Sequence, residues 1–157
     1  MKQETLNALD NIFLSTPIMR ADGVPTDKEI AEASERLEIP FPNDYVEFLR
    51  MFGGAMVGPY PVFGLRPVDV MEDERWSVVE ITEATRASLN EAAGWVVFSE
   101  DHGGNPIGFD SSGIIVIYDH DFGGTSKLAD DFEGYLRSQC LKITGAAQKD
   151  GRNGKPV

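Results

Sequence analysis

The chain has 157 residues, one cysteine, and 26 acidic side chains against 14 basic ones, so its formal net charge is −12. This length suits one domain, which buries roughly 68–70% of the surface of the unfolded chain and therefore requires neither disulfides nor a structural metal. The acidic balance disfavours direct binding to nucleic acid, because such binding depends on Lys and Arg side chains that neutralise phosphates. It favours a basic protein as the partner.

The sequence also bears on the cellular compartment. No run approaches the roughly 18 consecutive apolar residues that span a bilayer, and the first residues lack the basic start and apolar core of a secretory signal. The lone Cys140 cannot form an internal disulfide, which agrees with a reducing compartment. We therefore expect a cytoplasmic protein that has no membrane partner.

The first third of the chain predicts helices. Apolar residues recur at helical spacing in the opening segment, at Leu6, Leu9, Ile12 and Phe13. Thr26 and Glu29 form a capping-box pattern, which predicts that a second helix begins there. This helix has to end before Pro40, because the residue that precedes a proline disfavours helical dihedrals. Its predicted buried face consists of Ile30, Ala33 and Leu37.

The next segments predict two more helices and a strand between them. Pro42 suits a first helical turn, Gly53 and Gly54 end the segment, and the apolar stripe between them is Tyr45, Phe48, Leu49 and Phe52. After further breaks at Gly and Pro, residues 62–65 form a short apolar run that predicts a strand entering the sheet. The Ala and Glu content of residues 77–93 favours a helix, which Gly94 closes.

The strongest strand signals follow at residues 95–98, 106–109 and 114–118, which are rich in β-branched and aromatic residues. Residues 110–113 form a good hairpin connection. A last helix is predicted over residues 128–141, with Asp130 and Asp131 in its first turn, where the helix dipole favours negative charge. Helices followed by a meander of strands and a closing helix indicate an α+β fold.

The order of these motifs resembles the SUKH superfamily, which includes the yeast cell-wall assembly regulator and many bacterial immunity proteins. Residues 39–45, read as IPFPNDY, lead into Phe48-Leu49 and Gly53-Gly54, and this is similar to the family signature LP-x-x-Y-x-x-F-L … G-G. Ile39 stands where the family usually has Leu. Further pieces in the family order are Trp95–Phe98, Gly103-Gly104-Asn105, Ile107–Asp110, Val116–Tyr118, Asp119-His120-Asp121, Phe132 and Leu136. The resemblance covers residues 26 to 141.

The resemblance implies a single domain with a mixed, mostly antiparallel sheet flanked by helices. We expect a SUKH-like domain at residues 26–144. Outside the resemblance, helical spacing predicts an N-terminal helix and loop at residues 1–25, and the Gly, Lys, Asn and Pro content of residues 145–157 predicts a flexible tail that is too polar to pack. The family pattern offers no accepted catalytic set. We therefore expect no catalytic residue, no metal and no cofactor.

In bacteria, the resemblance implies an immunity protein that binds and neutralises a cognate toxin. Many such toxins are nucleases, whose active sites are cationic because they hold phosphates. A chain with a net charge of −12 can occupy such a site by presenting similar charge. The alternative within the superfamily is a regulatory or scaffold module that binds other proteins.

An acidic segment is the first candidate for the interface. Asp69, Glu72, Asp73 and Glu74 can steer a basic partner, while Trp76 supplies a large anchor. The alternative is a solvated loop with Trp76 in the core. A second candidate is a soft, adaptable groove, because Met and aromatic side chains accommodate varied partners. Its members would be Met51, Met56, Met71 and residues 60–63, although such residues more often fill a core.

Two clusters of carboxylates and imidazoles lie at strand ends, at residues 100–102 (EDH) and 119–121 (DHD). They are the only groups that resemble a metal site or an acid–base pair, so a metal-dependent hydrolase is the alternative from another functional class. No H-E-x-x-H or phosphate-binding motif accompanies them, and turn chemistry explains both clusters. We expect Asp101, Asp119 and Asp121 to contact the partner instead.

Overall fold

The computed structural model describes residues 1–72 and 75–143. The predicted helices of the first third are confirmed: α1 spans Gln3–Ser15, α2 spans Asp27–Leu37 and α3 spans Asn43–Phe52, and a short 3₁₀ turn, η1, lies at Pro17–Met19. The capping box at the start of α2 is formed, because the Glu29 backbone N–H donates to Thr26 Oγ1 at 3.1 Å and the Thr26 N–H donates to Glu29 Oε1 at 2.8 Å.

A two-stranded hairpin follows α3. β1 (Ala55–Val57) pairs with β2 (Tyr60–Val62) across a turn in which Gly58 has a φ of 60°. The prediction of a strand at residues 62–65 that enters the sheet is therefore wrong in its position and its partner. Directly after β2, the chain runs beside the main sheet, and the Phe63 N–H donates to the Phe98 carbonyl at 2.7 Å. Gly58 and Pro59, which the sequence indicates as a break in the chain, form the turn of this hairpin.

The predicted helix over residues 77–93 divides into two elements. α4 ends at Ser88 (Val78–Ser88), Leu89 adopts an extended conformation with a φ of −139°, and a 3₁₀ helix, η2, spans Asn90–Gly94. Side-chain contacts favour this turn over a continuous helix. Arg86 of α4 donates to the Trp95 carbonyl at 2.7 Å, which requires the chain to fold back onto α4.

The main sheet contains four antiparallel strands in the order β3-β4-β5-β6. Three of them confirm the predicted strands: β3 (Val96–Glu100), β4 (Pro106–Phe109) and β5 (Ile115–Tyr118). The predicted start of the last helix at residue 128 is wrong, because residues Thr125–Ala129 form β6. The helix α5 begins at Phe132 (Phe132–Tyr135), with Asp131 as its N-cap, and continues as a π-helical segment, η3, at Leu136–Cys140.

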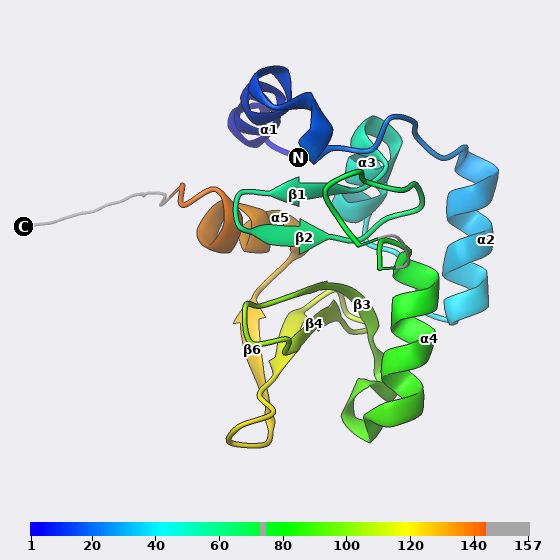
Figure 1. Cartoon of the computed structure of the whole chain (residues 1–157). Helices are drawn as coiled ribbons and strands as arrows, with labels where there is room; N and C mark the ends of the chain where they lie inside the picture. Colours follow the sequence, from blue (N-terminus) through cyan, green and yellow to red (C-terminus); the bar gives the residue numbers. More distant parts are fainter. Residues whose placement is uncertain (73–74, 144–157) are drawn as a thin grey trace, which may run out of the picture.

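Thr82 of α4 closes one edge of this sheet. Its hydroxyl accepts a hydrogen bond from the Val97 N–H at 2.9 Å and is 3.4 Å from the Val97 carbonyl. The other edge is β6, whose first residues are exposed and polar. α2 lies beside α4 on one side of the molecule (Figure 1). An ion pair between Arg36 and Glu83 at 2.8 Å joins the two helices.

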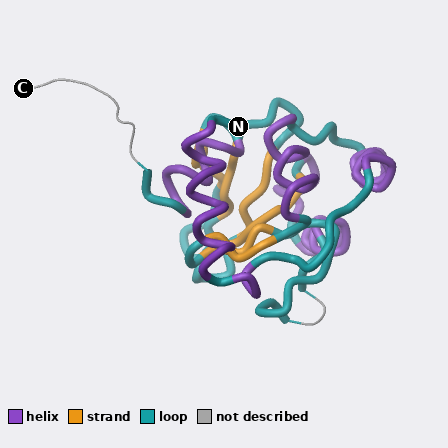
Figure 2. The backbone as a smooth tube through the Cα atoms, turned by 90° about the horizontal axis from the view of Figure 1, so that it is seen from above, coloured by secondary structure: helices purple, strands orange, loops and turns teal. Residues whose placement is uncertain are grey.

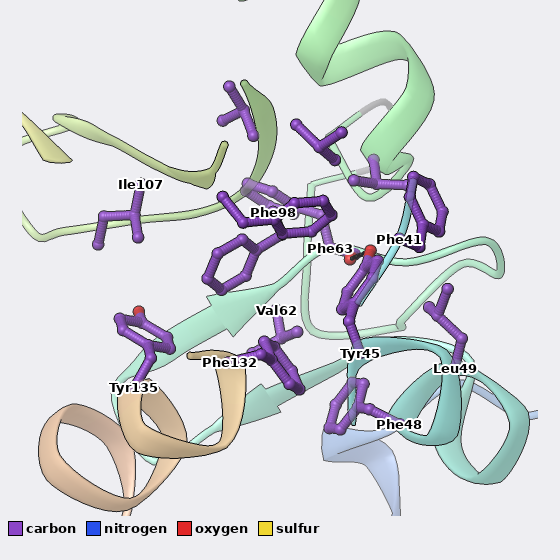
Figure 3. Close-up of a cluster of buried hydrophobic side chains, with 14 of the residues drawn as sticks. Phe41, Tyr45, Phe48, Leu49, Val62, Phe63, Phe98, Ile107, Phe132 and Tyr135 are labelled. Carbon is purple, nitrogen blue, oxygen red and sulfur yellow. Dashed lines mark hydrogen bonds between the residues drawn. The ribbon is translucent and has the colours of Figure 1, made fainter. Parts of the chain in front are cut away.

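An aromatic cluster forms the centre of the core (Figure 3). Phe132 lies 5.3 Å from Phe98 of β3 and 5.2 Å from Tyr45 of α3, measured between ring centroids. The buried hydroxyls have partners: Tyr45 donates to the Phe63 carbonyl at 2.7 Å, and Tyr135 lies 2.8 Å from Ser99 Oγ. The cluster therefore joins α3, α5, the hairpin segment and the main sheet, and the helices surround the strands (Figure 2).

α1 belongs to the same core. Leu9 is fully buried and Phe13 packs on Phe52 with 5.0 Å between ring centroids. Thr5 donates a hydrogen bond to Glu133 at 2.7 Å, which fixes α1 to α5. Within the described residues, no helix combines the length and the apolar character that a membrane span requires. The predicted flexible tail at 145–157 lies outside the residues that the structure describes.

Candidate partner-binding site

The two Asp–His clusters meet at one end of the main sheet. In an antiparallel meander, the β3–β4 loop and the β5–β6 loop leave the sheet at the same end. Asn105 connects them, because its Oδ1 accepts from the His120 N–H at 2.9 Å and its Nδ2 donates to Asp101 Oδ2 at 3.0 Å. The neighbouring strands therefore bring both predicted clusters together, as their positions in the sequence suggested.

The carboxylates of these clusters hold their own loops. Asp101 Oδ1 accepts hydrogen bonds from the backbone N–H groups of Gly103 and Asn105, both at 2.9 Å. Partial burial raises the pKa of Asp101, but hydrogen bonds from Asn105 and Gly103 outweigh that effect and hold the pKa below its ordinary value. Asp119 Oδ1 accepts from the N–H groups of Asp121 at 2.8 Å and Phe122 at 3.2 Å. Both carboxylates thus have clear structural roles.

The two imidazoles point into different surroundings. The His102 ring stacks on Tyr60 with 5.1 Å between centroids, whereas the His120 ring meets Tyr118 edge-on at 5.4 Å. In the part of the chain that the structure describes, no group of three or more His, Cys, Asp or Glu side chains is arranged to hold a metal ion. The proposed hydrolase centre would need such a group, so the geometry gives it no support.

A groove of about 290 Å³ lies between the hairpin, the loop that follows it and the end of β3. We call it the acidic groove. Its lining combines apolar residues, which we call its floor, with charged residues, which we call its rim: Met56, Pro59, Pro61, Phe63, Val70, Met71, Glu72, Arg75, Glu100, Asp101 and His102. Of the residues predicted to form a soft groove, Met56, Pro61, Phe63 and Met71 line this one. Met51, Tyr60 and Val62 do not, and Val62 is buried in the core.

A smaller cavity of about 160 Å³ adjoins the acidic groove. Both are lined by Arg75 and Glu100, whose side chains form an ion pair at 2.6 Å. The smaller cavity also reaches His120 of the β5–β6 loop. The groove, the ion pair and the two loops therefore form one continuous face at this end of the sheet.

The family comparison matches residues 24–138 to the SMI1 / KNR4 family (SUKH-1). The chain belongs to this family. This confirms the resemblance inferred from the sequence motifs and the α+β fold that the resemblance implied. No curated protein matches the chain. Membership in SUKH-1 supports an interaction domain of the immunity or regulator type, a group that is generally not enzymatic.

This SUKH-1 domain brings together part of the predicted interface. Glu72 of the acidic segment and Asp101 of the first Asp–His cluster line the same groove, although they are far apart in the sequence. Asp69 and Asp121 are exposed outside it, and Asp119 is half-buried in its turn. Trp76 is half-buried, and its carbonyl accepts a hydrogen bond from the Gly64 N–H at 3.1 Å. Asp73 and Glu74 lie outside the described residues.

The sequence did not indicate two residues of this face, Arg75 and Phe122, as interface candidates. Arg75 pairs with Glu100 of the first Asp–His cluster only through the fold, so no local pattern relates them. Phe122, at the tip of the β5–β6 loop, is 89% exposed. The sequence does contain a signal for its exposure. An aromatic residue between Asp121 and a Gly-Gly pair lies in a turn and not in a strand that would bury its ring.

Proposed function

We propose that this SUKH-1 chain is an immunity protein, which binds and neutralises a bacterial toxin through the face that contains the acidic groove. The observation that carries the proposal is the groove itself, where carboxylates from two distant segments stand over an apolar floor. Among the described residues, Arg75 pairs with Glu100, so Glu72 and Asp101 leave the described part of the rim with an excess of negative charge. Such a rim attracts a basic surface.

The floor and the rim contribute differently to binding. Met56 and Met71 supply flexible, polarizable apolar contacts that adapt to the surface of a partner. The exposed carboxylates contribute mainly to the rate of association and to the choice of partner, because solvent screens them in the free protein. The proposal therefore assigns apolar contact to the floor and steering to the charges.

A nuclease is the toxin that best fits this arrangement. Its substrate cleft has to be cationic to hold phosphates, and a chain with a net charge of −12 presents matching charge over its surface. Occlusion of that cleft would block the substrate without any chemistry in the immunity protein. The same face would serve a regulatory module only if its partner were another basic protein.

The test is a kinetic measurement by surface plasmon resonance, with the purified product of the open reading frame that neighbours the gene of this chain as the candidate toxin. We expect the association rate to fall at least about tenfold between about 50 and about 500 mM salt, because the screening length is near 8 Å at 0.15 M. Glu72→Lys should slow association about threefold at low salt, and dissociation should change less.

Asp10→Lys is the matched control, because Asp10 is an exposed carboxylate on α1, outside the groove. It changes the net charge as Glu72→Lys does, but it should have a smaller effect on association. Absence of binding by the wild-type chain would contradict the proposed function. Equal effects of the two substitutions would show that the groove is not the contact surface.

A further inference from the structure

Phe122 is the most exposed large apolar side chain among the described residues, with 89% of its surface accessible. It lies at the tip of the loop between β5 and β6, on the end of the sheet that carries the acidic groove. An apolar ring in water is unfavourable by roughly 25 cal/mol for each Å² that a partner would cover. A contact that buries it would therefore be stabilised substantially.

The turn itself does not use the Phe122 side chain. Asp119 organises it by accepting from the N–H groups of Asp121 and Phe122, and the Gly123 N–H donates to the Asp119 carbonyl at 2.8 Å. Gly123 and Gly124 supply the positive φ angles of 70° and 115° that the turn needs. These bonds involve only the backbone of Phe122, so its backbone is held in the turn while its ring forms no hydrogen bond there.

The surroundings of the ring are acidic. Asp121 is exposed beside it, and Asp119 lies in the same loop with His120 as the neighbouring imidazole. Through Asn105, this loop is hydrogen-bonded to Asp101 on the rim of the acidic groove. A surface that receives the ring thus also meets several carboxylates. Its complement is an apolar pocket bordered by Lys or Arg side chains.

We propose that Phe122 is the aromatic anchor of the interface and inserts into an apolar pocket, bordered by basic side chains, on the toxin that covers the acidic groove. This inference rests on the proposed function and adds the residue that dominates the affinity. Anchors of this kind are typically aromatic and become fully desolvated in the complex. A partner can bury a larger fraction of the Phe122 side chain than of Trp76, which is already half-buried in the free chain.

The experiment compares the full-length wild-type chain, Phe122→Ala and Leu14→Ala in surface plasmon resonance against the product of the neighbouring open reading frame, the candidate toxin. Leu14 is the matched control, because it is 80% exposed but lies on α1. We expect Phe122→Ala to raise the dissociation rate at least about 30-fold and to change the association rate less than about threefold. Leu14→Ala should leave both rates within about twofold. Thermal unfolding should be the same in all three proteins.

The outcomes separate this inference from the proposed function. If the wild-type chain binds the toxin and Phe122→Ala binds equally well, the anchor is wrong and the proposed function stands. If the wild-type chain does not bind, the proposed function fails and the anchor fails with it. If sedimentation velocity shows a wild-type dimer that Phe122→Ala dissociates, the ring binds a second copy of the chain, which also overturns the inference.

Discussion

Asn105 is the residue that joins the two loops of the candidate face. Its side-chain oxygen accepts from one loop and its side-chain nitrogen donates to the other, at 2.9 Å and 3.0 Å. The oxygen and the nitrogen of one side-chain amide therefore both form hydrogen bonds. The relative position of Asp101 and Phe122 depends on this amide. The Gly-Gly-Asn motif is part of the family pattern, and the structure shows the physical role of its Asn side chain.

Asn105→Ala should lower the free energy of unfolding by about 1–2 kcal/mol, because it removes one partly buried and one exposed hydrogen bond. It should also raise the pKa of Asp101, since the Asn105 amide is a main cause of its lowered value. A carboxylate with a depressed pKa stabilises the fold above its ordinary pKa, and this stabilisation is lost as the pH falls through the folded pKa. In the variant, the part of the acid-induced loss of stability that Asp101 contributes should therefore be smaller.

Urea denaturation at several acidic pH values and an NMR titration of the Asp101 carboxyl group measure both effects. Ser111→Ala is a suitable control, because Ser111 is exposed in the hairpin turn at the opposite end of the sheet. An Asp101 pKa that is the same in the wild type and in Asn105→Ala would show that the amide does not hold this carboxylate.

At the scale of elements, β3 is an edge strand that a helix protects. An unpaired edge exposes backbone donors and acceptors, which invites pairing with other chains. Thr82 covers this edge with one hydroxyl, which serves both the N–H and the carbonyl of Val97. Thr82 is fully buried, so its hydroxyl is a structural group.

Thr82→Val should lower the free energy of unfolding by about 1–3 kcal/mol, because the shape is kept while the buried Val97 N–H loses its partner. Thr85→Val on the same helix is the matched control. The Thr85 hydroxyl donates to the Ile81 carbonyl within α4 at 2.7 Å, and its loss should cost less than about 0.5 kcal/mol. Equal losses in chemical denaturation would contradict the protective role of Thr82.

The sequence predicts some elements well and others poorly, for physical reasons. α3 was predictable because Tyr45, Phe48 and Phe52 form an apolar stripe that helical geometry alone explains. β6 was not predictable, because its residues Thr125–Ala129 are mostly exposed and carry no alternating apolar pattern. It exists because β5, the preceding strand, offers it backbone partners, and such pairing requires no apolar pattern. The hairpin β1–β2 was missed because each strand has only three residues and β2 contains Pro61.

The candidate site follows the same division. Asp101 and Asp119 could be recognised as neighbours because antiparallel strands bring their loops to one end of the sheet. The proximity of Glu72 to Asp101 could not be predicted, because it depends on how the loop after the hairpin lies against β3. Patterns within one element were therefore visible in the sequence, whereas contacts between distant segments required the fold.

At the scale of the whole molecule, the net charge of −12 acts on stability as well as on binding. Like charges repel in the compact state, and salt screens this repulsion. Salt also weakens ion pairs, but those of this chain are largely exposed, as in Arg36–Glu83 and Arg50–Asp27. Exposed pairs contribute only about 0–1 kcal/mol each. The repulsion between excess carboxylates should therefore be the larger effect.

We accordingly expect the Tm of the isolated chain to rise by about 2–4 °C when NaCl is raised from about 0.05 to about 0.5 M, which corresponds to roughly 1 kcal/mol for a domain of this size. Association with a basic toxin should respond in the opposite direction, because there the screened interaction is attractive. Asp10→Lys, which reduces the negative charge, should raise the Tm at low salt and diminish the salt effect. Calorimetry at both salt concentrations measures whether the Tm rises or falls with salt. A Tm that falls with salt would show that ion pairs within the chain outweigh its overall repulsion. The charges of the acidic surface would then be neutralised by ion pairs within the free chain.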